Sequence, residues 1–240
     1  AASGHPQALI ETLSEDRLAA FAEAPLLDHY DIYQHLMDYR VLSMQDDCYL
    51  ISADGWVKAA QPQPIVEVKN AKTKEKPDFT VGKKKYKTEL IPSALVIARY
   101  FAKEQAAIGK LEADIASLSQ QVEELDEEHG GEGGLLEDAK NDKDKLTKAS
   151  VATRLKDIKG DADAADEHKL LTDYLALSEQ EATASAALKA AQESLMDAVL
   201  QQYARLTEDD IKTLVVDDKW LATLAAAVQG ELDRVSQTLT

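Results

Sequence analysis

The stretch IGKLEADIASLSQQVEEL, residues 108–125, decides the fold class of this 240-residue chain. Its large apolar side chains recur at alternating intervals of three and four residues, which places them on one helix face as a coiled-coil seam. A glycine-rich run at residues 127–134 is expected to end this helix. A second helical pattern at residues 163–206 predicts an antiparallel helical hairpin. The seam residues are Ile108, Leu111, Ile115, Leu118, Val122 and Leu125.

The patterns outside the hairpin complete a mainly α fold with one small β element. Three runs between residues 47 and 90 are β-like and are separated by glycine, proline and lysine, which predicts a small antiparallel hairpin or ribbon. These runs are Cys48–Ile51, Ile65–Val68 and Tyr86–Leu90. The predicted parts are short helices plus a lysine-rich β-hairpin at 1–91, the coiled-coil hairpin with a tip helix near 147–159 at 92–206, and C-terminal helices at 207–240.

Local signals set the expected helix starts. Pro92 stands where the first long helix is expected to begin. Thr147 is a candidate N-cap for the tip helix, and Thr207 with Asp210 three residues later forms a capping box for the next helix. The final helix is expected to begin near Asp217 or Asp218, just before Trp220.

Composition limits the possible functions. The formal net charge of -17 excludes a surface that binds DNA everywhere, so any nucleic-acid contact must be local. Cys48 is the single cysteine, no apolar stretch approaches membrane-spanning length, and residues 1–6 do not have the character of a signal peptide, so we expect a cytoplasmic protein. The chain lacks a starting methionine and carries an apolar stripe almost to its last residue, so we expect a piece of a longer protein.

One lysine-rich island is the candidate site for phosphate contacts. Its eight lysines face only Glu75 and Asp78, a strong local contrast within an acidic chain. Lysine without arginine or interleaved aromatics suits phosphates but not base recognition. A solvated hairpin tip explains the pattern equally well, and both interpretations stay open. The candidates are Lys69, Lys72, Lys74, Lys76, Lys83, Lys84, Lys85 and Lys87.

The C-terminal apolar stripe is the candidate subunit interface, because no cap or glycine ends it. Its residues are Trp220, Leu221, Leu224, Val228, Leu232, Val235 and Leu239.

Catalytic patterns are weak. Glu67 and Lys69 on an apolar run, with Asp54 upstream, resemble the arrangement of metal-dependent restriction nucleases, yet an ordinary hairpin explains them as well. His29 and His35 point apart on a helix, so they do not predict a metal site. We therefore assign no catalytic, cofactor-binding or metal-binding residues.

Several strings, in this order and spread over nearly the whole chain, resemble the C-terminal region of the modification (M) subunit of type I restriction–modification systems. The matching strings are Pro25–Asp28, Tyr33–Tyr39, Met44–Tyr49, Ile97–Phe101, Glu127–Gly131, Leu206–Lys212, Val216–Trp220 and Gln229–Val235.

The resemblance implies a role in a larger enzyme. Such subunits are S-adenosylmethionine-dependent adenine methyltransferases that assemble as two M subunits with one specificity (S) subunit and recruit a restriction subunit. Their catalytic Asn-Pro-Pro-aromatic motif and glycine-containing cofactor loop are not found in these residues. The expected function is therefore non-catalytic: docking on the S subunit's long helices and helping to hold DNA. The alternative is a free-standing coiled-coil adaptor or chaperone-like arm.

Overall fold

A computed structural model describes residues 34, 37, 39, 43–65, 76–161 and 163–238 of the chain. The short helices predicted between residues 6 and 45 lie almost entirely outside these residues. Lys69, Lys72, Lys74 and Leu239 also lie outside them, as do all but the first residue of the Ile65–Val68 run.

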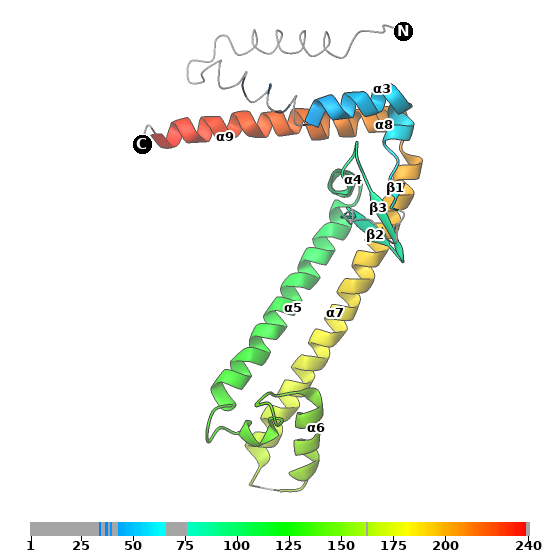
Figure 1. The fold of residues 1–240 in the computed structure, drawn as a ribbon. Coiled ribbons are helices and arrows are strands. Elements are labelled where there is room, and N and C mark those ends of the chain that lie inside the picture. The colour runs from blue at the N-terminus through cyan, green and yellow to red at the C-terminus, as the bar shows by residue number, and fades with distance from the viewer. Residues whose placement is uncertain are drawn as a thin grey trace. The chain divides into compact units, whose positions relative to one another are not determined.

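The fold is mainly α, with a helical hairpin and a small antiparallel sheet, as the sequence predicts (Figure 1). The chain divides into two compact units. One consists of Ala1–Tyr100 with Met196–Thr240, and the other of Phe101–Leu195. The predicted three-part division places its boundaries elsewhere. The structure groups α4 (Ser93–Tyr100) and the last turns of α7 (Ala165–Arg205) with the small sheet and the C-terminal helices.

The second unit is built on α5 (Ala102–His129), which runs antiparallel to α7. Two hydrogen bonds between the helices show that they are antiparallel: the partner with the lower number in α5 pairs with the higher number in α7. Ser119 Oγ donates to Glu181 at 2.6 Å, and Gln192 Nε2 donates to Glu112 at 3.4 Å. Of the predicted seam, Ile108 is buried, and the other five members are half-buried.

A small core lies at the tip of the hairpin, where the chain passes from α5 to α7. It is formed around α6 (Lys148–Asp157) and a single 3₁₀ turn, η2 (Glu137–Ala139). Thr147 caps α6 through a reciprocal capping box with Ser150, as predicted for Thr147. The buried members of this core are Leu136, Ala139, Val151, Ile158, Leu171 and Tyr174, and Val122 and Leu125 of the seam pack against them.

The first unit combines a three-stranded sheet with helices. The strands are β1 (Gln63–Pro64), β2 (Phe79–Val81) and β3 (Lys84–Lys87), in the antiparallel order β1-β3-β2. In the described part of this unit the helices are α3 (Gln45–Ala59), α4, the end of α7, α8 (Glu208–Lys212), the π-helical segment η3 (Thr213–Leu221) and α9 (Ala222–Thr238). Among the described residues, its fully buried large side chains are Leu90, Ile91, Val96, Val199, Tyr203, Ile211, Leu214 and Val215.

Three local predictions are wrong. Residues Cys48–Ile51 belong to helix α3 rather than to a strand, because short apolar runs fit either structure and tertiary contacts decide between them. The first long helix is interrupted at Phe101, whose backbone angles of -130° and 29° separate α4 from α5. The last helix does not begin near Asp217, because η3 continues α8 directly into α9.

Glycine substitutions in α5 and in the β2–β3 turn should have opposite effects on stability. Gly109 lies in the interior of α5 with no atom near the position of an added Cβ, so Gly109→Ala should raise the free energy of unfolding by about 1 kcal/mol. Gly82 has a φ of 59°, which strains any residue with a side chain. Gly82→Ala should therefore lower the free energy of unfolding by about 1–3 kcal/mol, although no atom lies near the position of the added Cβ. Urea unfolding monitored by circular dichroism measures both. Equal signs for the two variants would contradict the local backbone description.

Candidate nucleic-acid and subunit-docking surfaces

The described part of the lysine island forms a β-hairpin, residues 76–87, which we call the lysine wing. Strands β2 and β3 pair from Phe79 with Tyr86 to Val81 with Lys84, leaving a two-residue turn at Gly82 and Lys83. Only the first turn residue has a positive φ, which is the pattern of a type II′ turn and requires glycine there. Gly82 therefore allows a tight turn, and Lys83 lies at the tip of the hairpin.

The two faces of the lysine wing differ in chemistry. Phe79 and Tyr86 stack on one face with ring centroids 5.4 Å apart. Because side chains alternate along a strand, Lys85 and Lys87 lie on the opposite face, and Lys85 pairs there with Thr80. The alternation of side chains along the strands therefore gives the wing one apolar face and one basic face.

Tyr203 of α7 anchors the apolar face. Its ring lies parallel to that of Phe79 with centroids 6.3 Å apart, and its hydroxyl donates to the carbonyl oxygen of Ile91 at 2.7 Å. Burial raises the pKa of the Tyr203 hydroxyl well above its ordinary value, so it stays a protonated donor. Gln61 Nε2 also donates to the Tyr203 carbonyl at 3.1 Å, which holds the chain just before β1 to α7. The wing is thus fixed at its base.

Asp78 is the one acidic side chain of the wing. Its carboxylate accepts from the Thr88 backbone N–H at 2.7 Å and the Thr88 hydroxyl at 3.0 Å, and Lys87 Nζ lies 3.4 Å away. Burial opposes ionisation, but these hydrogen bonds and the charge of Lys87 outweigh it and lower the pKa of Asp78. The carboxylate is therefore ionised and partly neutralises Lys87.

The predicted phosphate-contacting lysines divide into three groups. Lys76, Lys83, Lys84 and Lys85 are exposed on the wing, and Lys87 is half-buried there. The remaining three lie outside the described residues. The structure thus gathers five of the eight candidates on one hairpin, and their contact with DNA stays a prediction.

The predicted interface stripe is less uniform than its spacing indicates. Trp220 and Leu224 are buried within the first unit. Leu221 is 36% exposed, and Val228 and Leu232 are half-buried. The side chain of Val235 and all of Leu239 lie outside the described residues. Leu221, Val228 and Leu232 are therefore the stripe positions that a partner could reach.

A buried charged cluster that the sequence analysis missed explains the burial of Trp220. The Asp47 carboxylate accepts from Lys219 Nζ, 2.8 Å from Oδ1 and 2.7 Å from Oδ2, and from Trp220 Nε1 at 2.7 Å. Lys219 also donates to the carbonyl oxygen of Leu90 at 2.8 Å. The cluster ties α3 to η3 and to the segment after β3. No local pattern reveals it, because Asp47 and Lys219 are 172 residues apart.

The π-helical geometry of η3 suits this cluster. In an α-helix, neighbouring side chains diverge by about 100°, so adjacent residues seldom reach one acceptor. A π-helix is wider, with i→i+5 hydrogen bonds, and its neighbouring side chains diverge less. Lys219 and Trp220 are adjacent and both bind Asp47, which makes the carboxylate the fixed point of this segment.

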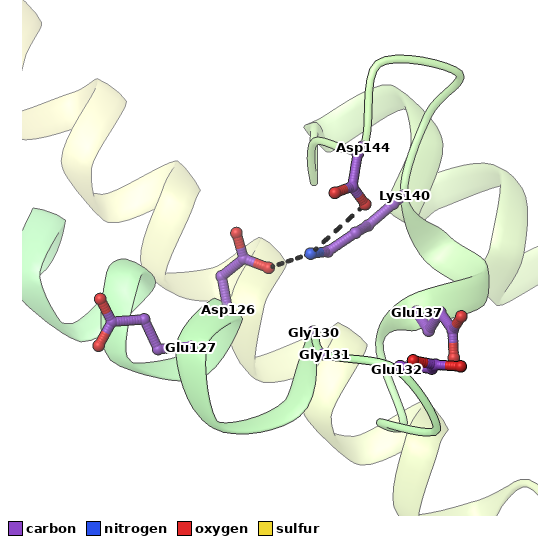
Figure 2. Close-up of a pocket in the computed structure, with 8 residues that line it drawn as sticks. All are labelled: Asp126, Glu127, Gly130, Gly131, Glu132, Glu137, Lys140 and Asp144. Atoms are coloured by element: carbon purple, nitrogen blue, oxygen red, sulfur yellow. Dashed lines mark ion pairs between the residues drawn. The ribbon is translucent and has the colours of Figure 1, made fainter.

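An acidic hollow lies in the second unit where α5 ends (Figure 2). Lys140 Nζ lies 3.1 Å from Asp126 and 3.8 Å from Asp144. The hydrogen bond to Asp126 raises the pKa of Lys140. Figure 2 shows the lysine between these two carboxylates, so its ammonium already supplies the positive charge there. Within the described residues, no group of acidic, histidine and cysteine side chains could hold a metal ion.

The structure leaves the nuclease arrangement without support among the residues it describes. Asp54 lies on helix α3, where it pairs with Lys58 four residues later. Glu67 and Lys69 lie outside the described residues. Burial, aided by the negative charge of Asp47, raises the pKa of the Cys48 thiol, which disfavours the thiolate.

No family model matches this chain, and neither a curated protein nor a solved structure is significantly similar to it. The resemblance to type I modification subunits therefore stays a prediction. None of the described helices combines the length and apolar character needed to cross a membrane.

Removing the charge of Asp47 should destabilise the first unit strongly. Asp47→Asn keeps an acceptor for Trp220 but leaves the Lys219 ammonium, 14% exposed, without its counter-charge, which should cost about 3 kcal/mol of unfolding free energy. Chemical denaturation monitored by tryptophan fluorescence measures the loss. The control is Asp54→Asn, which breaks a surface pair and should cost less than about 1 kcal/mol. If both variants lost a similar amount of unfolding free energy, the buried cluster would not be a main source of stability for the first unit.

Proposed function

We propose that this chain is the non-catalytic C-terminal assembly region of a type I restriction–modification M subunit. In this role it docks on the S subunit and helps to hold DNA, while a methyltransferase domain elsewhere in the protein binds S-adenosylmethionine and methylates adenine. The second M subunit and the restriction subunit are further partners that the resemblance implies. The chain itself would bind no cofactor.

The observation that carries the proposal is the incomplete cover of two apolar helical ridges. Leu111, Ile115 and Leu118 remain half-buried although α7 runs beside α5. Two helices alone leave part of each apolar stripe in water, whereas a bundle of three or four helices encloses it. In the other unit, Leu221 and Val228 leave a similar partly covered ridge.

The chemistry of these ridges favours a helical partner. Seam residues of α5 recur with a heptad spacing, and the side chains between them are mostly exposed. Such a stripe fits the grooves of another long helix better than it fits a flat sheet. The S subunits of the resembled family present long helices between their DNA-reading domains, which supports this choice of partner.

A free-standing coiled-coil adaptor would carry the same half-covered ridges. It differs in its partner, because an adaptor has no affinity for an S subunit. Binding to the S subunit's helical spacer therefore separates the two functions.

The purified chain should co-elute with the S subunit's helical spacer on size exclusion. Leu221→Lys should weaken this association at least tenfold, since it places a charge on the exposed part of the predicted interface. Leu135→Lys is the matched control, because Leu135 is 45% exposed in the loop after α5 and is not a stripe residue. Isothermal titration gives the affinities, and circular dichroism checks that both variants are folded. A folded wild-type chain that fails to bind the spacer would refute the proposed function.

A further inference from the structure

We propose that the lysine wing binds the phosphates of double-stranded DNA along its outward face and does not recognise base sequence. This inference deepens the proposed function and rests on it for the presence of DNA.

The outward face offers a regular row of cations. Lys83 occupies the turn, and Lys85 and Lys87 follow at alternate positions of β3. At about 3.4 Å per residue, the row spans about 13 Å. One strand of B-DNA carries about four phosphates over that length of helix axis, one per 3.4 Å. The row thus matches a short segment of the DNA backbone in length and sign.

The base of the wing extends this basic surface. A groove there is lined by Lys76, Lys87 and the hydroxyl-bearing Thr88, together with Asp78 and the start of α4. The Asp78 carboxylate is occupied by Thr88 and Lys87, so its repulsion of a phosphate is reduced. Phosphate oxygens accept hydrogen bonds from lysine and threonine side chains alike.

The position of the aromatic rings argues for duplex rather than single-stranded nucleic acid. Proteins that hold single strands stack the bases on exposed aromatic side chains. Phe79 and Tyr86 stack instead on each other, on the face of the wing that packs against Tyr203. Phe79 is buried, so it offers no platform for a base.

The composition of the outward face favours phosphate contacts over base readout. Lys85, Lys87 and Thr80 lie there, with Gln63 of β1 beside Lys87 at the edge. No arginine in the described wing can make the bidentate contacts to guanine that dominate sequence recognition. Anchoring by Tyr203 keeps the wing ordered before DNA arrives, which lowers the entropic cost of binding.

Salt-dependent binding of the full chain to a short fluorescent duplex tests the proposal. At low salt the wild type should bind duplexes of two unrelated sequences equally, and both more tightly than a single strand of equal length. The double variant Lys83→Ala with Lys85→Ala should make the negative slope of log affinity against log salt shallower by about 2. Each lost phosphate contact changes that slope by about 0.9. Lys84→Ala, on the opposite face, should leave the slope nearly unchanged.

A charge-matched control separates local contacts from net charge. Lys103 and Lys110 are exposed on α5, so Lys103→Ala with Lys110→Ala removes the same charge from another place. This variant should keep the wild-type slope. Equal slopes for the two double variants, a preference for the single strand, or no binding at low salt would each overturn the proposal. S-subunit capture by the same proteins needs no DNA, so its outcome reports separately on the proposed function.

Discussion

A helix with one apolar face must place that face against another surface, and this constraint organises the hairpin unit. The seam of α5 packs along α7, and the contact between Ser119 and Glu181 records their antiparallel direction. At the tip, Val122 and Leu125 join the small core formed around α6. Between Ile108 and that core, a single neighbouring helix covers the seam only in part. The same constraint that forms the hairpin therefore leaves a surface suited to a further helix.

The other unit depends on a buried charge. Asp47 brings two donors from η3 to α3, and Lys219 also satisfies a buried carbonyl oxygen at Leu90. Among the described residues, the partners of this carboxylate are Lys219 and Trp220, both distant from it in sequence. A carboxylate buried in this way is acceptable only when it is paired and hydrogen-bonded, which makes the arrangement of these segments specific. Trp220 is drawn into the fold by the same contact and leaves Leu221 on the surface.

The lysine wing is a local basic surface on an acidic protein. The alternation of side chains along β3 places its aromatic ring and its outward lysines on opposite faces. Tyr203 holds the aromatic face, so the basic face projects from an ordered base. Local charge of this kind acts over about a Debye length, roughly 8–10 Å at physiological salt, and is therefore little cancelled by distant carboxylates.

Periodicity and turn chemistry determined much of this protein from sequence alone. The seam around Leu118 predicted the hairpin. The N-cap residue Thr147 and the capping box at Thr207 located two helix starts, because these signals depend on neighbours within one or two turns. Tertiary structure alone decided that Trp220 is buried, since its indole donates to Asp47, 173 residues away. It also decided that the short apolar run at Cys48 is helical. Local patterns carry no information about which distant partner a buried charge will find.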